Sequence, residues 1–303
     1  MTAVPALIFD CDGVLADTER DGHRVAFNET FAEVGVPVQW SVDEYADRLK
    51  SGGGKERMAS LLTPEFVAAN DLPADPEGQK ALLADWHKRK TARYKEMVRA
   101  GRLPGRPGIA RVVSEAIDAR WTLAVASTSA EESVRAVLEH AVGAEHASRF
   151  AVFAGDIVPA KKPDPAIYDL AIVKLGIARG DAIVVEDSRN GLLAAARAGL
   201  RCVVTLSSYT AEEDMSEAVL VVTSLGDPGE PAVVEANRVG VSVGPLVTLA
   251  DLSFCMSATV RSVNLSKRQY SMASLMSASL SGVDVIGSFQ GQDGAQGPTM
   301  TDK

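Results

Sequence analysis

The sequence predicts an α/β fold: a Rossmannoid, doubly wound parallel sheet with a helical cap inserted after the first strand. Short apolar runs without alternation, which are typical of buried parallel strands, lie at residues 4–10, 121–126, 151–154, 182–185 and 201–205. From the second run on, helical segments alternate with the runs, and this order places helices on both faces of a parallel sheet. Between the first two runs the pattern is helical throughout, which indicates the insertion.

Breaks in these patterns predict the domain boundaries. We expect a core formed by residues 1–17 and 103–226, with the helical cap over residues 18–102. A linker rich in Pro and Gly follows the cap directly. The segment 227–303 begins with Pro and Gly residues and becomes rich in Ser, Met and Gly, so we expect it to be mostly disordered, with limited order around 233–252.

Composition excludes several classes of protein. The 303 residues carry a net charge of −9, whereas a nucleic-acid-binding protein would show a basic footprint, so no nucleic-acid partner is expected. No apolar run is long enough to span a bilayer, and Asp10 interrupts the first one too early for a signal peptide. On these features alone we expect no membrane partner, no transit peptide in this sequence, and a cytoplasmic monomer.

Two acids follow the first predicted strand. Asp10 and Asp12 are two residues apart, so their side chains point to the same side of an extended chain. Close carboxylates repel unless a cation or a shared proton compensates, which favours a nucleophile and an acid/base group around a divalent metal. Taken alone, the stretch fits an ordinary Asx turn equally well.

Polar residues also follow three further strands. They are Ser127, Thr128 and Ser129 after the second strand, Lys162 after the third, and Glu186 and Asp187 after the fourth. Each group has an ordinary alternative; Ser129 and Glu132, for example, fit a helix capping box. Because ligands of open α/β sheets bind at the carboxyl ends of the strands, we expect all four groups to converge there. The set suits phosphoryl transfer through an aspartyl-phosphate, with Mg²⁺ neutralising charge and a lysine holding phosphate oxygens.

In this order the motifs resemble those of the haloacid dehalogenase-like superfamily of phosphohydrolases. The motifs are Asp10-x-Asp12-Gly13-Val14, Ser127-Thr128-Ser129, Lys162-Pro163-Asp164-Pro165 and Glu186-Asp187-Ser188-x-Asn190-Gly191. The resemblance implies that Asp10 is the nucleophile and that Asp12 is the acid/base, both also binding Mg²⁺. It implies a phosphate site formed by Ser127, Thr128, Ser129 and Lys162. Asp187, alone or together with Glu186, would complete the metal site.

Other segments resemble the CbbY-type xylulose-1,5-bisphosphate phosphatases in their plant and algal form. They are Cys11 and residues 17–31, 52–58, 153–159 and 184–188. The resemblance implies an enzyme that removes xylulose 1,5-bisphosphate, a misfire product and inhibitor of Rubisco. It also implies a location in the chloroplast stroma.

Residues of the cap suit the second phosphate and the sugar of such a substrate. Glycines at 52–54 let backbone N–H groups approach an anion, and Lys55 and Arg57 supply positive charge. The expected substrate-binding residues of the cap are Glu19, Gly53, Gly54, Lys55, Glu56 and Arg57, with Glu19 facing sugar hydroxyls. Without the resemblance, the glycines fit a flexible hinge before a helix.

Four alternatives remain open at this point. A relative of β-phosphoglucomutase, or a broader sugar-phosphate phosphatase, would share the core and differ in the cap. A phospho-aspartate receiver is also doubly wound with an acid cluster and a lysine, but it lacks a large helical insert. A non-catalytic sugar-phosphate binder is disfavoured because no catalytic position is missing.

Overall fold

The computed structural model describes residues 4–50 and 53–259. Its strands are β1 (Ala6–Phe9), β2 (Thr122–Ser127), β3 (Phe150–Ala154), β4 (Ala182–Glu186), β5 (Arg201–Thr205), β6 (Leu220–Val222) and β7 (Val234–Asn237). Its helices are η1 (Thr18–His23), α1 (Arg24–Glu33), α2 (Val42–Leu49), α3 (Gly54–Ala59), α4 (Pro64–Ala69), α5 (Pro76–Arg99), α6 (Ile109–Asp118), α7 (Glu131–Val142), α8 (Ala144–Ala147), α9 (Ala166–Leu175), η2 (Arg179–Asp181), α10 (Arg189–Arg197) and α11 (Leu249–Ser257). None of the helices in the described ranges combines the length and hydropathy that crossing a membrane requires.

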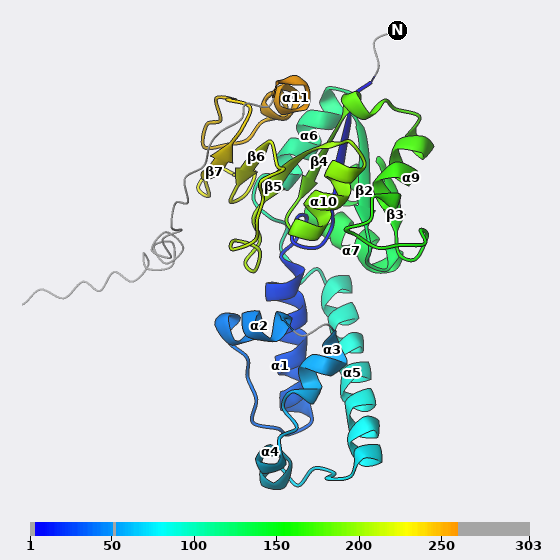
Figure 1. Ribbon diagram of the computed structural model, residues 1–303, viewed down its shortest axis with the longest axis vertical. Coiled ribbons are helices and arrows are strands. Elements are labelled where there is room, and N and C mark those ends of the chain that lie inside the picture. The colour runs from blue at the N-terminus through cyan, green and yellow to red at the C-terminus, as the bar shows by residue number, and fades with distance from the viewer. Residues whose placement is uncertain (1–3, 51–52, 260–303) are drawn as a thin grey trace, which may run out of the picture. The chain divides into compact units, whose positions relative to one another are not determined.

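The described strands form a seven-stranded sheet in the order β3-β2-β1-β4-β5-β6-β7 (Figure 1). Neighbouring strands are parallel except for β6 and β7, which are antiparallel. Phe9, the last residue of β1, is level with Val125 of β2 and Val185 of β4. The carboxyl ends of these three strands therefore lie side by side, and the predicted doubly wound α/β fold is confirmed.

Alternate residues of β1 point to opposite faces of the sheet. Leu7 and Phe9 belong to an apolar cluster that includes residues of α6, α7 and α11. Ala6 and Ile8 belong to a second cluster, with residues of α9 and α10. Figure 1 shows these helices on the two sides of the sheet. Since both faces are covered, the strand is apolar without alternation, as parallel strands usually are.

The inserted helical block has an apolar cluster of its own. Five aromatic side chains are buried in it: Phe27, Phe31, Trp40, Tyr45 and Trp86. The rings of Phe31 and Trp40 meet edge to face, with 4.9 Å between their centroids. The block starts with a π-helical segment, η1, and returns to the core through α5, the long helix that the sequence predicts. A separate cluster supports our assignment of residues 18–102 to a cap.

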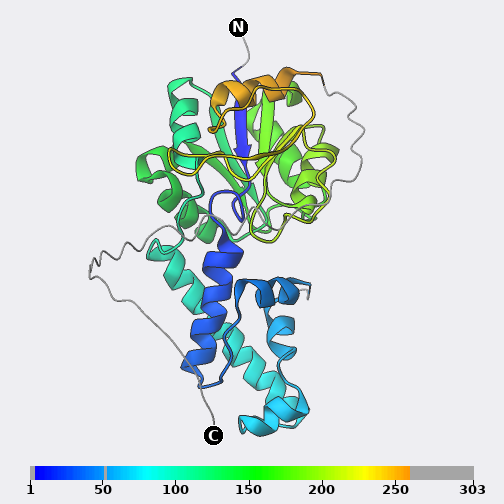
Figure 2. The same cartoon turned by 90° about the vertical axis from the view of Figure 1, so that its left-hand side faces the viewer.

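The segment after residue 227 differs from the sequence-based expectation. We expected it to be mostly disordered with limited order around 233–252, and residues 227–259 contain β7, which pairs with β6, and α11. Leu249 and Leu252 of α11 are buried in the same cluster as β1. Figure 2 shows α11 (orange) at the end of the sheet where β1 (blue) begins. The order extends beyond residues 233–252, because two short elements between chain breakers carry little periodic signal and packing on the sheet stabilises them. Residues 260–303 of the expected tail lie outside the described residues.

Candidate active site

An ion pair between Asp10 and Lys162 lies at the centre of the site. Asp10 follows β1 directly, and its N–H donates to the carbonyl of Val185 at 2.9 Å, which extends the β1–β4 ladder to this residue. Lys162 Nζ donates to Asp10 Oδ1 at 2.6 Å. Asp10 Oδ2 has no hydrogen-bond partner within the described part of the chain. One oxygen of the expected nucleophile is therefore available to a ligand.

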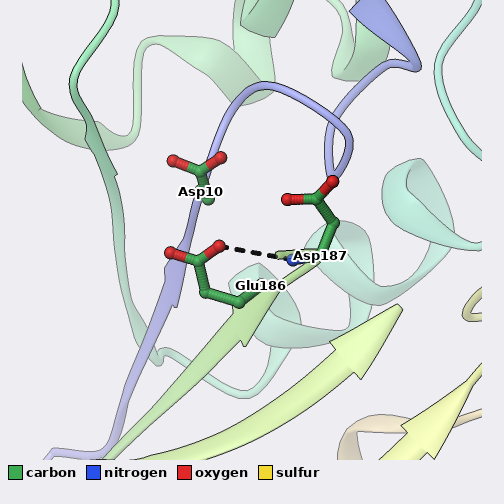
Figure 3. Close-up of side chains that lie close together, drawn as sticks. All are labelled: Asp10, Glu186 and Asp187. Atoms are coloured by element: carbon green, nitrogen blue, oxygen red, sulfur yellow. Dashed lines mark hydrogen bonds between the residues drawn. The ribbon is translucent and has the colours of Figure 1, made fainter. Parts of the chain in front are cut away.

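Three carboxylates gather where β1 and β4 end (Figure 3). Asp10, Glu186 and Asp187 are buried, and each offers an oxygen within 4.8 Å of the others. Gly13 makes this possible, because a Cβ at its position would lie 2.0 Å from Asp187 Oδ2. Hard carboxylate oxygens are the ligands that Mg²⁺ prefers, so these residues fit the predicted metal. The side chain of Asp12 lies outside this set.

Burial makes the charged forms of these acids costly. It raises the pKa of Asp10 to about 7; Lys162 opposes the shift, while Glu186 and Asp12 add to it. Burial likewise raises the pKa of Asp187 well above its usual range, and Glu186 and Asp10 act in the same direction. A divalent cation would relieve this repulsion.

Two hydroxyl groups hold Asp12 beside the cluster. Thr18 Oγ1 donates to Asp12 Oδ1 at 2.7 Å, and Ser129 Oγ donates to Asp12 Oδ2. The sequence predicts that Ser129 caps a helix with Glu132, but the N-cap of α7 is Ala130 and no side chain caps it. This prediction is wrong because the hydroxyl of Ser129 contacts Asp12 instead.

The remaining phosphate-binding candidates lie at the end of β2. Ser127 is buried, and its Oγ accepts a hydrogen bond from the N–H of Ser129 at 3.2 Å. Thr128 is partly exposed. The carbonyl of Ala126 accepts from Lys162 Nζ at 2.8 Å, so the lysine bridges the ends of β1 and β2.

Arg106, which the sequence analysis did not single out, ties together the loops of the site. Its guanidinium donates to the carbonyls of Gly13, of Thr205 at 3.0 Å, of Leu206 at 2.6 Å and of Thr223 at 2.7 Å. These carbonyls lie after β1 and at or after the ends of β5 and β6. In the sequence Arg106 stands in a Pro- and Gly-rich linker, where nothing distinguishes it from a solvated arginine.

In the cap, Glu19, Tyr45 and Arg57 form a connected group, which we call the cap triad. Tyr45 OH donates to Glu19 Oε2 at 2.7 Å and accepts from Arg57 Nη1 at 2.8 Å. Burial raises the pKa of Glu19, and the charge of Arg57 opposes this shift. Glu19 and Arg57 are both predicted site residues, whereas Tyr45 was missed because its role depends on a contact 26 residues away.

The glycine segment of the cap carries further predicted site residues. Gly53 has a φ of +120°, and a Cβ there would lie 2.4 Å from Glu56 Oε2; a Cβ on Gly54 would lie 3.1 Å from the ring of His87. Lys55 and Glu56 are exposed, and within the described ranges neither forms a hydrogen bond or ion pair with the cap triad. The third glycine of the motif lies outside the described residues.

Lys90 of α5 is a buried cation that the sequence analysis did not include in the site. Its Nζ lies 2.8 Å from His23 Nδ1 and 4.5 Å from the centroid of the Phe27 ring. Within residues 4–50 and 53–259, no carboxylate forms an ion pair with it. Burial lowers the pKa of Lys90 to about 8, and Glu19 opposes the shift. A buried charge without such a partner is costly, and an anionic ligand would supply one.

The loop after β5 joins the core to the cap. The N–H and Oγ of Ser208 donate to Asp17 Oδ2 at 3.1 and 2.5 Å. The ring of Tyr209 meets that of Tyr45 edge-on, with 5.8 Å between centroids. Through these contacts the core supports the tyrosine at the centre of the cap triad.

Comparison with known proteins identifies the family. The family model for haloacid dehalogenase-like hydrolases matches residues 4–199. A CBBY-like protein of Arabidopsis thaliana is 47% identical over 231 residues, which cover 76% of this chain and 72% of that protein. A protein CbbY of Cupriavidus necator is 42% identical over 230 residues, which cover 75% of this chain and 87% of that one.

A solved structure agrees with these relatives. CbbY from Rhodobacter sphaeroides, determined as a mutant in complex with xylulose-(1,5)bisphosphate, superposes with a TM-score of 0.59. It is 37% identical, and the match covers 82% of this chain and 99% of that one. The sheet, the acid cluster, the family model and the relatives agree: the chain belongs to the haloacid dehalogenase-like hydrolases and is a phosphatase of their CbbY-like branch.

Proposed function

We propose that the protein is a Mg²⁺-dependent sugar-bisphosphate phosphatase that converts xylulose 1,5-bisphosphate to xylulose 5-phosphate through a phosphorylated Asp10. The observation that carries this proposal is the presence of two cationic positions in two parts of the fold. Lys162 pairs with the nucleophile in the core, and Lys90 is buried in the cap without a carboxylate partner in the described ranges. Two such positions suit a substrate with two phosphates.

Asp10, Glu186 and Asp187 would hold the metal, and the backbone carbonyl of Asp12 would add a ligand, as the family resemblance implies. When bound, Mg²⁺ would supply charge neutralisation at the phosphoryl group. The chain's own residues do the rest of the chemistry.

The first half-reaction transfers the phosphoryl group to the enzyme. Asp10 Oδ2 attacks phosphorus, the ester P–O bond breaks, and Asp12 gives its proton to the departing sugar oxygen. Lys162 holds Asp10 Oδ1 and faces the transferred group. Thr18 and Ser129 keep the Asp12 carboxyl in place.

The second half-reaction restores the enzyme. A water molecule attacks the phosphorus of the aspartyl-phosphate while Asp12 takes its proton. The bond between phosphorus and the Asp10 oxygen breaks, which releases inorganic phosphate and frees the carboxylate. Closure of the cap would keep other water out until the aspartyl-phosphate forms. Small-angle scattering with and without a substrate analogue tests this closure, and identical profiles would argue against it.

The cap binds the rest of the substrate in this proposal. Arg57 and Lys90 would hold the second phosphate, and Glu19 would accept hydrogen bonds from sugar hydroxyls. Gly53 and Gly54 would let backbone N–H groups approach the phosphate, and Lys55 and Glu56 would reach the substrate in the closed form. The complex of Rhodobacter sphaeroides CbbY with xylulose-(1,5)bisphosphate supports the choice of substrate. The similarity to an Arabidopsis protein supports a location in the chloroplast stroma, where Rubisco would release this inhibitor.

Phosphate release in the presence of Mg²⁺ tests the proposal. The panel contains xylulose 1,5-bisphosphate, ribulose 1,5-bisphosphate, fructose 1,6-bisphosphate, glucose 1-phosphate and β-glucose 1,6-bisphosphate. We expect strong preference for the first, and no turnover by Asp10→Asn, a variant that keeps the shape of the side chain. A flat profile would remove the assigned substrate, and activity in the variant would remove the aspartyl-phosphate. Interconversion of glucose 1-phosphate and glucose 6-phosphate would identify a mutase instead.

A further inference from the structure

Tyr168 has no part in the site described so far, yet it lies directly behind it. This residue of α9 is completely buried, and its hydroxyl donates to Glu186 Oε1 at 2.5 Å. Its ring centroid lies 5.0 Å from Lys162 Nζ, within the range of a cation–π interaction. Apolar packing alone would be served by phenylalanine, so the buried hydroxyl calls for a separate explanation.

The contacts of Lys162 supply that explanation. An ammonium group has three donors, and three acceptors surround Lys162 Nζ: Asp10 Oδ1 at 2.6 Å, Ala126 O at 2.8 Å and Glu186 Oε1 at 2.6 Å. Ala126 O is a backbone atom in β2 and cannot move far. If Glu186 is equally fixed, two of the three N–H bonds are anchored and the third is directed at the nucleophile.

Glu186 is held from all sides. Its Oε1 accepts from Lys162 and from Tyr168, and its Oε2 accepts from the N–H of Asp187 at 3.3 Å. Gly191 of α10 packs against the carboxyl, since a Cβ there would lie 2.0 Å from Glu186 Cδ. The residue has no exposed surface. Tyr168 supplies the one side-chain hydroxyl in this set of contacts.

We propose that Tyr168 is a positioning residue: its hydroxyl fixes Glu186 as the anchor of Lys162, so that the remaining N–H of the lysine points at Asp10 and at the phosphoryl group that Asp10 accepts. Tyr168 does not touch the substrate and acts through Glu186. The inference rests on the phosphatase activity of the family and not on which sugar phosphate is the substrate. p-Nitrophenyl phosphate is therefore a suitable probe.

The test compares Tyr168→Phe, which removes the hydroxyl and keeps the ring, with Thr30→Val. Thr30 is also fully buried, and its hydroxyl donates to the carbonyl of Ala26 in the cap, away from the site. Because a hydrogen bond to a charged group is stronger than one between neutral groups, we expect kcat of Tyr168→Phe to fall about tenfold. KM should change much less, and Thr30→Val should retain the kcat of the wild type.

Binding of Mn²⁺ in place of Mg²⁺, followed by electron paramagnetic resonance, provides the second readout. The dissociation constant for Mn²⁺ should change much less than kcat in Tyr168→Phe, because the hydroxyl binds Glu186 Oε1 and leaves Oε2 and the other carboxylates of the metal site in place. An unchanged kcat would show that the hydroxyl only fills space. Weakening of Mn²⁺ binding in proportion to kcat would show that Tyr168 orients a metal ligand, and either result overturns the proposal.

A second variant keeps the proposal testable if Tyr168→Phe proves too unstable to purify. Glu186→Gln keeps the size of the side chain and an acceptor oxygen but removes the charge that holds Lys162. We expect it to lower kcat more than it weakens Mn²⁺ binding. The reverse order would show that Glu186 acts mainly through the metal and would overturn its role as the lysine's anchor. Loss of sugar-bisphosphate selectivity in the substrate panel, with these results intact, would count against the proposed substrate alone.

Discussion

The packing of Gly191 against Glu186 makes an unusual prediction about stability. Gly191 lies in the first turn of α10, and glycine in a helix is less favourable than alanine by up to about 1 kcal/mol. Helix propensity alone therefore predicts that Gly191→Ala stabilises the protein. The structure predicts the opposite, because the added Cβ would lie 2.0 Å from both the Cδ and an oxygen of Glu186.

The size of the effect follows from the contacts of Glu186. Ordinary van der Waals contact begins at 3.4 Å, so the carboxyl must retreat by about 1.4 Å. That movement breaks hydrogen bonds of 2.6 Å from Lys162 and 2.5 Å from Tyr168. Because hydrogen bonds to charged groups contribute about 1.5–3 kcal/mol each and overpacking adds strain, we expect a net loss of ~2 kcal/mol in the free energy of unfolding. Lys162 loses its anchor, so kcat should fall at least about tenfold.

Urea unfolding followed by circular dichroism measures the first effect, and turnover of p-nitrophenyl phosphate with Mg²⁺ measures the second. Gly180→Ala is a matched control, because a Cβ at that position meets no atom within 4 Å. Its free energy of unfolding should stay within about 0.5 kcal/mol of the wild type. A Gly191→Ala protein that is more stable and fully active would refute the described packing of Glu186.

Three further predictions concern the metal, the cap and the C-terminal segment. Burial raises the pKa of Asp10 from 3.8 to about 7. Between these pH values the folded apoprotein binds more protons than the unfolded chain, so its free energy of unfolding falls as pH rises. Mg²⁺ should therefore raise Tm more at pH 8 than at pH 5, and equal shifts would contradict the carboxylate cluster. Tyr45→Phe removes the hydroxyl that joins Glu19 to Arg57, so KM for xylulose 1,5-bisphosphate should rise about tenfold while turnover of p-nitrophenyl phosphate changes little. Ending the chain at residue 226 exposes the apolar cluster that Leu249 shares with β1. Because each buried leucine contributes about 1.5–3 kcal/mol, Tm should drop sharply. An unchanged Tm would mean that α11 contributes no stability.

The sequence by itself determined the class of fold and the place of the candidate site. Both rest on local signals: buried parallel strands are apolar without alternation, and polar residues follow them where the strands end. Asp10, Lys162, Glu186 and Asp187 could be named because the carboxyl ends of parallel strands must meet at one edge of the sheet. In the structure Lys162 lies at hydrogen-bonding distance from Asp10 and Glu186, and the three carboxylates each offer an oxygen within 4.8 Å of the others.

Only the tertiary structure decided which partner each side chain takes. Ser129 has the sequence context of a helix cap but donates to Asp12, which is 117 residues away. Arg106 and Lys90 have the context of solvated cations, yet one binds carbonyls of three loops and the other is buried beside His23. Tyr168 has the context of an ordinary core residue. These roles depend on contacts between segments far apart in the chain, and periodicity and local propensity report only on a residue's near neighbours in sequence.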